Sequence, residues 1–298
     1  MTSNRQTTTG ILYGLGCYLW WGLCPLYFKS VAHVPAGEVL AQRIVWSLVL
    51  LLILLARRGD LVATLAQARQ PRIFLTLTAT TLLVAVNWFT FIWAVSHDLL
   101  LQASLGYFIN PLVNVLLGLV ILRERLRPLQ WVSLALATIG VVIMGLRLGG
   151  LPVISLVLAF SFGFYGLMRK MTAVGGVRGL TIETGILTPV ALGAMLFWQG
   201  KAELVFGHLD RSTDLLLMAS GVVTAVPLIW FANAARRLRY STVGFLQYLA
   251  PSLQFLLAVF VYHEPFARSE LLSFILIWSA LGMFTLDAVV RARRSNAP

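Results

Sequence analysis

The stretch GYFINPLVNVLLGLVILRE, residues 106–124, combines two asparagines and a proline with a long run of apolar residues. An apolar run of about 20 residues is long enough to cross a bilayer as a helix. Asparagine and proline are unfavourable in the middle of such a helix unless they face protein or water. The stretch therefore predicts a membrane helix whose polar face has a role in packing or in function.

The composition of the whole chain supports the same class of protein. Of the 298 residues, 59% are hydrophobic and 11% are charged, against about 25% charged in globular proteins. Apolar segments of membrane-spanning length follow one another at residues 10–28, 36–56, 73–95, 100–122, 129–146, 152–168, 179–199, 213–235, 241–262 and 271–290. We expect an all-α polytopic membrane protein with ten transmembrane helices.

The formal charge of +12 is distributed by loop. Seventeen of the 23 lysines and arginines lie at the N-terminus, in the even-numbered loops or in the C-terminal tail, and five lie in the odd-numbered loops. The positive-inside rule then places both termini and the even loops in the cytoplasm. The basic charge therefore reflects topology, and no nucleic-acid partner is expected.

The chain contains an internal repeat. A shift of 140 residues aligns the opening stretch with LQYLAPSLQFLLAVFVYHE, residues 246–264. The aligned positions that keep a proline, an amide or a carboxylate are Pro111 with Pro251, Asn114 with Gln254, and Glu124 with Glu264. Because five spans per copy is an odd number, the second copy enters the membrane inverted. We therefore predict two inverted five-helix repeats, residues 1–148 and 149–298.

One helical face is polar or small in both copies, because its positions are spaced three and four residues apart. The face comprises Tyr107, Asn110, Asn114 and Gly118 in the first copy and Gln247, Ala250, Gln254 and Ala258 in the second. Each proline also frees the carbonyl four residues earlier and disturbs the helix there. Polar groups of this kind on inverted-repeat helices indicate a cavity for substrate, although amides also join neighbouring helices.

The second and seventh apolar segments contain charged residues. Arg43 lies about 10 Å inside the second segment, where its charge must face protein or water. It either pairs with a carboxylate such as Glu38 or Glu183, or anchors an anionic group of the substrate. Glu38 and Glu183 begin the second and seventh segments. Each either caps a helix N-terminus or takes part in gating or proton coupling.

Aromatic residues within the segments, such as Trp88 beside Asn87, suit a cavity for ligands with flat or apolar parts. The substrate-binding residues that we predict are Arg43, Asn87, Trp88, Tyr107, Asn110, Asn114, Tyr165, Gln247, Tyr248 and Gln254. The residues predicted for gating or coupling are Glu38, Glu183, Pro111 and Pro251. All four histidines fall in predicted loops. We therefore expect no catalytic set, no metal and no cofactor.

The chain resembles the RarD-type proteins of the EamA branch of the drug/metabolite transporter superfamily over about residues 9–290. The segments that carry the resemblance are VPAGEVLAQRIVWS (34–47), NWFTFIWAV (87–95), ASLGYFINPLVNVLLG (103–118), AFSFGFYGLMRK (159–170), IETGILTPVA (182–191) and VTAVPL (223–228) through RLRYSTVGFLQYLAPSLQFLLAV (237–259). The resemblance implies a ten-helix basket of inverted repeats around a central cavity in the bacterial inner membrane. It also implies transport of small organic molecules, often as export.

The sequence has no P-loop pattern, which favours a secondary transporter of small organic molecules that works by alternating access. The alternatives are an integral-membrane enzyme, which needs a convergent set of reactive groups, and a non-transporting receptor or assembly factor. The partners expected are a small-molecule substrate and the lipid bilayer, with a homodimer as an option.

Overall fold

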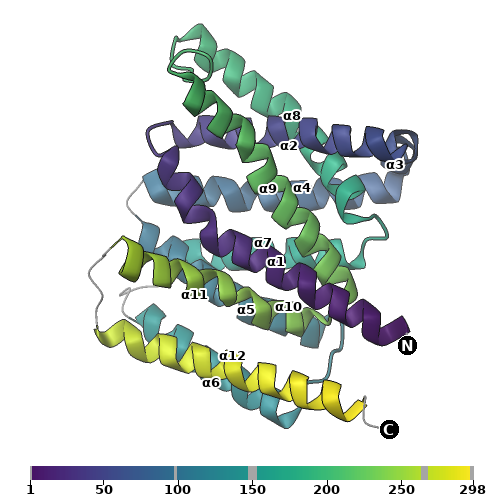
Figure 1. Ribbon diagram of the computed structural model, residues 1–298, viewed down its shortest axis with the longest axis vertical. Helices are drawn as coiled ribbons and strands as arrows, with labels where there is room; N and C mark the ends of the chain where they lie inside the picture. The colour runs from purple at the N-terminus through teal and green to yellow at the C-terminus, as the bar shows by residue number, and fades with distance from the viewer. Residues whose placement is uncertain (1, 97–98, 147–152, 263–267, 296–298) are drawn as a thin grey trace. The chain divides into compact units, whose positions relative to one another are not determined.

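The computed structural model describes residues 2–96, 99–146, 153–262 and 268–295 (Figure 1). All regular structure in these ranges is helical. The elements are α1 (Thr2–Ser30), α2 (Ala36–Arg58), α3 (Leu61–Ala68), α4 (Pro71–Ser96), α5 (Leu100–Val120), α6 (Pro128–Leu146), α7 (Val153–Met171), α8 (Gly176–Gly200), α9 (Arg211–Arg237), α10 (Tyr240–Gln247), α11 (Leu249–Leu256), the π-helix η1 (Leu257–Val261) and α12 (Arg268–Ser295). Helices suit the apolar sequence because each backbone group bonds within its own segment.

Within the described residues, a helix occupies each of the predicted apolar segments, and α3 is a short helix that the sequence did not predict. In the part of the chain that the structure describes, eight helices are long and apolar enough to cross a membrane, and two shorter apolar helices accompany them, Leu105–Val120 and Leu271–Asp287. The chain is therefore an all-α polytopic membrane protein. The number of ten transmembrane helices stays a prediction.

The ninth apolar segment is interrupted. Helix α10 ends at Gln247, α11 begins at Leu249, and η1 follows. Pro251 has no N–H to donate to the carbonyl of Gln247, so the interruption lies where the sequence predicted a disturbance. Helix α5, in contrast, continues through Pro111.

The chain forms two compact units, each built from two stretches of sequence. The first unit joins Met1–Val86 with Met168–Arg237, and the second joins Asn87–Leu167 with Leu238–Pro298. The units are defined by the packing of helices, and the predicted repeats are defined by similarity in sequence. The division into units therefore does not test the predicted repeats. The predicted repeat boundary, within residues 147–152, and Glu264 lie outside the described residues.

In the first unit, α9 packs against both α1 and α2, and α2 also packs against α8 (Figure 1). Glycine permits the closest of these approaches. A Cβ on Gly221 of α9 would overlap the backbone carbonyl carbon of Trp46 on α2. A Cβ on Gly16 of α1 would lie 3.0 Å from the ring of Trp230 on α9. Small residues at such crossings let membrane helices gain van der Waals contact that lipid does not provide.

In the second unit, α6 runs beside α12, and α5 packs against α10 (Figure 1). The rings of Phe108 on α5 and Phe274 on α12 meet edge to face with centroids 5.5 Å apart. A Cβ on Gly244 of α10 would lie 2.7 Å from the carbonyl oxygen of Pro111. The α5–α10 contact is therefore close enough for side chains on the two helices to bond directly.

Candidate functional site

Three amide side chains of the second unit form a buried cluster, which we call the amide cluster: Asn110, Asn114 and Gln247. Asn114 donates from Nδ2 to Oε1 of Gln247 at 2.7 Å, which joins α5 to α10. The same nitrogen lies 3.3 Å from Oδ1 of Asn110, one helical turn away. Asn110 in turn donates to the carbonyl of Ala159 on α7 at 2.6 Å. The cluster therefore connects three helices through neutral groups.

Asn87 makes a second link to α7. Its Nδ2 donates to the carbonyl of Leu158 at 2.9 Å and to the hydroxyl of Ser161 at 3.0 Å. Close approach of α7 to α5 depends on Gly163, where a Cβ would lie 2.7 Å from Val113. Asn87 and Asn110 thus both bond to α7, at Leu158 and Ser161 and at Ala159.

The other predicted residues of the second unit differ in environment. Tyr107 is 37% exposed, with its ring centroid 5.9 Å from that of Phe91, so the predicted polar face is only partly buried. Tyr165 and Tyr248 are buried. The half-buried side chains are Trp88 and Gln254, and the buried prolines are Pro111 and Pro251.

Glu38 and Arg43 lie on α2 in the first unit. The Glu38 carboxylate is 1% exposed and accepts backbone N–H bonds from Val205 at 2.9 Å and from Phe206 at 2.8 Å. It thereby holds the loop before α9. Arg43 donates from Nε to Oγ1 of Thr224 on α9 at 2.8 Å, and its guanidinium lies 5.2 Å from the ring centre of Phe28.

Glu183 forms an ion pair with Arg169 in the first unit, which we call the charged pair. Arg169 Nε lies 3.7 Å from Oε1 of Glu183, and both side chains are buried. Thr80 on α4 donates its hydroxyl to the same oxygen at 2.6 Å. A Cβ on Gly179 would overlap Nη1 of Arg169, so this glycine leaves space for the guanidinium. Two charges are thus desolvated together, which is favourable only while both remain.

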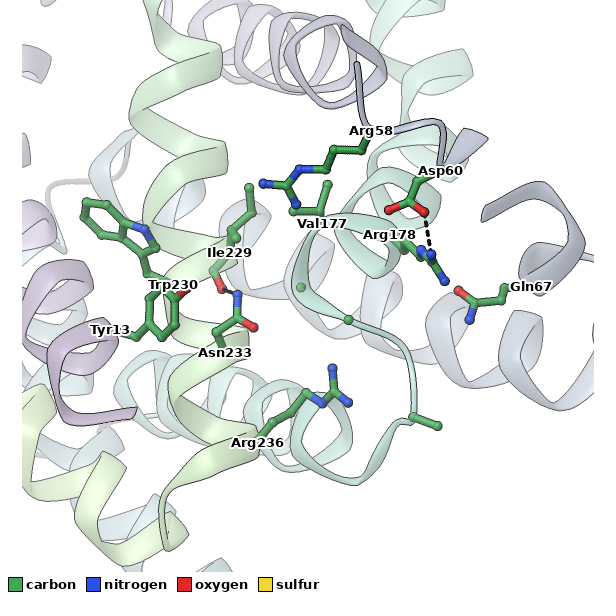
Figure 2. Close-up of a pocket in the computed structure, with 13 residues that line it drawn as sticks. Tyr13, Arg58, Asp60, Gln67, Val177, Arg178, Ile229, Trp230, Asn233 and Arg236 are labelled. Carbon is green, nitrogen blue, oxygen red and sulfur yellow. Dashed lines mark hydrogen bonds and ion pairs between the residues drawn. The ribbon is translucent and has the colours of Figure 1, made fainter. Parts of the chain in front are cut away.

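The first unit also contains a pocket of about 510 Å³ beside the N-terminus of α8. Three arginines line it, Arg58, Arg178 and Arg236, and we call it the arginine pocket. Figure 2 shows Arg58 and Arg236 on opposite sides of the space. Arg178 donates to Asp60 at 2.6 Å. The remaining lining residues are Tyr13, Gln67, Ala173, Gly175, Gly176, Val177, Ile229, Trp230 and Asn233.

Comparison with known proteins settles the family. Residues 8–146 match the EamA-like transporter family. The chain is 45% identical to Protein RarD of Escherichia coli (strain K12), over 98% of this chain and 99% of that protein. The chain is a RarD-type member of the EamA-like transporter family. It is also 43% identical to the uncharacterized transporter YojE of Bacillus subtilis (strain 168), over 99% of both chains. An uncharacterized transporter of Vibrio cholerae is 45% identical over 97% of this chain and 96% of that protein.

A protein of known crystal structure shares the fold of this RarD-type chain. The two superimpose with a TM-score of 0.73 over 94% of this chain and 98% of the other, at 20% identity. The family and the apolar helices together assign the RarD-type chain to the bacterial inner membrane as a multi-pass protein.

Arg169 was not among the predicted site residues of this RarD-type chain. It was expected in a loop, among the basic residues that set the topology, whereas its side chain lies in the last turn of α7 and is 0% exposed. A signal was present, because Glu183 within an apolar segment requires a partner. The arginine pocket was also missed, since its residues are distant in sequence.

Proposed function

We propose that this RarD-type protein is a secondary active transporter of small organic molecules that works by alternating access. The observation that supports this best is the amide cluster, in which Asn114 and Gln247 meet beside the interruption of α10. Neutral amides both donate and accept, so they can exchange a protein partner for a polar group of a substrate. The carbonyl freed by Pro251 adds an acceptor near the same place.

The proposed architecture has ten transmembrane helices in two inverted repeats, residues 1–148 and 149–298, with both termini in the cytoplasm. The distribution of basic residues between loops supports it. In a background with Cys17 and Cys24 replaced by serine, Arg125→Cys and Arg237→Cys should resist an impermeant thiol reagent added outside cells. His208→Cys should react. Labelling of position 237 from outside would contradict the orientation.

Transport is tested with purified protein in sealed vesicles, by uptake and efflux of amino acids, aromatic metabolites and phenicol-like drugs. Asn114→Leu and Gln254→Leu should leave folding intact and lower transport about tenfold, the effect of losing about 1.4 kcal/mol of hydrogen bonding. Thr138→Ala is the matched control, because its exposed hydroxyl bonds only within α6. Unchanged turnover in both amide variants would rule out a substrate role for this face.

We further propose that Arg43 anchors an anionic group of the substrate. Its planar guanidinium presents a fork of donors, of which Nε binds Thr224, and lysine cannot reproduce that forked geometry. Arg43→Lys should therefore weaken substrate affinity, and Arg43→Gln should nearly abolish it, with both proteins folded. Unchanged binding with a sharply lower melting temperature would show instead that Arg43 is structural.

Glu183 is our candidate for ion coupling. Its Oε1 accepts a hydrogen bond from Thr80 and lies beside Arg169, and a carboxylate held in this way can change partners when it binds a proton. Glu38, Pro111 and Pro251 are the further candidates for gating. The double variant Arg169→Gln/Glu183→Gln removes the carboxylate without stranding a buried charge, so it should abolish transport driven by a pH gradient while exchange without a gradient persists. Gradient-driven transport at the normal rate would exclude Glu183 as the coupling residue.

A further inference from the structure

We propose that the arginine pocket binds the phosphate group of an anionic ligand, held by Arg58, Arg236 and the N-terminus of α8. This proposal concerns a different site from the substrate cavity and does not depend on transport. The volume of the arginine pocket, about 510 Å³, lies within the range of about 300–1,000 Å³ that is usual for small-molecule sites.

The first argument is the start of α8. The first N–H groups of any helix have no acceptor within the helix, and they carry a partial positive charge. Helix α8 starts after Gly175, which provides no side-chain cap. Gly175, Gly176 and Val177 line the pocket, so this 25-residue helix begins at its wall. Phosphate binds readily at such a helix terminus.

The second argument is the excess of positive charge. Arg178 pairs with Asp60, which accounts for the pocket's carboxylate. Within the described residues, neither Arg58 nor Arg236 has a carboxylate at ion-pair distance. Nη1 of Arg236 lies 3.7 Å from the position of a Cβ on Gly175. A cation beside the positive end of a helix is unfavourable unless an anion lies with it.

The third argument is a buried arginine behind the pocket wall. Arg169 is 0% exposed, and in the described part of the chain its Nε and Nη1 make no hydrogen bond. Its Nη2 reaches the carbonyls of Gly175 and Gly176, both at 3.5 Å. These two glycines line the pocket, so a fully buried guanidinium with unsatisfied donors adjoins its wall, while its charge is paired with that of Glu183.

Two sources could supply the phosphate group: a soluble phosphate compound or the headgroup of an anionic phospholipid. Tyr13 and Trp230 line the same pocket, and such aromatic side chains are common at the level of lipid headgroups. Under the proposed topology the pocket opens at the cytoplasmic face, where basic pockets between helices bind anionic headgroups.

The test measures binding to the full-length protein in detergent. One arm titrates inorganic phosphate, a second adds phosphatidylglycerol, and a third adds phosphatidylcholine as the lipid control, with melting temperature and affinity as readouts. We expect phosphatidylglycerol or phosphate to bind and raise the melting temperature. Binding of the lipid alone identifies a headgroup, and binding of inorganic phosphate identifies a soluble ligand.

The double variant Arg58→Gln/Arg236→Gln should bind at least about tenfold more weakly, because two charge-assisted hydrogen bonds are lost. Arg57→Gln removes the neighbouring exposed charge outside the pocket and is the matched control. It should bind like the wild type. Equal losses in the double variant and the control, or binding of neither phosphate nor phosphatidylglycerol, would overturn the proposal.

A stabilising variant distinguishes loss of binding from loss of folding. Val177→Asp places a carboxylate in the first turn of α8, inside the pocket. This internal anion should raise the melting temperature of the ligand-free protein and abolish phosphate or phosphatidylglycerol binding. A variant that melts no higher and binds normally would contradict an anion site at this helix terminus.

Discussion

The two units bury polar groups of different kinds. In the second unit the buried groups are the neutral amides of Asn110, Asn114 and Gln247, bonded to one another and to α7. In the first unit they include the charges of Arg169 and Glu183, whose atoms approach only to 3.7 Å. An amide exchanges partners at modest cost, whereas a stranded buried charge is strongly unfavourable. Breaking one buried polar contact should therefore lower the free energy of unfolding far more in the first unit than in the second.

The largest expected effect comes from breaking the charged pair. Arg169→Gln strands the buried Glu183 carboxylate and should lower the free energy of unfolding by about 3–5 kcal/mol. Thermal and denaturant unfolding in detergent measure it. Arg72→Gln removes an exposed charge and should change stability by less than about 0.5 kcal/mol.

The double variant Arg169→Gln/Glu183→Gln removes both charges and should recover most of that loss, because no uncompensated charge remains. If Arg169→Gln is as stable as the wild type, the contrast between the two units is wrong.

A smaller effect is expected from two glycines on the same helix. Gly179→Ala forces the Arg169 guanidinium away and should destabilise by about 1–3 kcal/mol, the usual cost of overpacking. Gly185→Ala meets nothing within 4 Å and should be neutral or stabilising by up to about 1 kcal/mol. Melting temperatures of the two variants, measured side by side, test the difference.

Gly179→Ala should lower the free energy of unfolding by less in the Arg169→Gln background, because the new methyl group then no longer overlaps the guanidinium. Equal costs of Gly179→Ala in the wild type and in Arg169→Gln would mean that the glycine serves another purpose.

The amide cluster should show weaker coupling. A double-mutant cycle of Asn114→Leu and Gln247→Leu should yield an interaction energy of about 0.6–1.7 kcal/mol, the range for hydrogen bonds between membrane helices. Unfolding free energies of the two single variants and the double variant measure it. A coupling of about 3 kcal/mol or more would remove the distinction between neutral and charged contacts.

The smallest effect is expected at an exposed charge. Ser212 and Thr213 donate hydrogen bonds to Asp210 and lower its pKa to about 2. A carboxyl with a lowered pKa stabilises the fold above its unfolded pKa of about 3.9, and that contribution disappears as the pH falls toward 2. Melting curves of Asp210→Asn should lack this component, while those of the wild type keep it. Identical pH profiles would mean that the loop bonds add no stability.

The amino-acid sequence determined the positions of the helices, because apolar runs of membrane length leave the backbone no other way to satisfy its hydrogen bonds. It also indicated the interruption at Tyr248, since the N–H that Pro251 lacks is a local property, but the matching disturbance predicted for Pro111 is not seen, because α5 continues through it. Asn110 and Asn114, singled out by helical spacing, are both buried.

Tertiary structure alone decided the partners. Asn114 aligns with Gln254 in the repeat, yet it bonds to Gln247. Arg169 was predicted to lie in a loop, whereas its side chain is buried and pairs with Glu183. Glu38 holds the loop at Val205 and Phe206. Helical spacing fixes which side of its own helix a residue occupies, but the neighbour it meets depends on how separate helices pack.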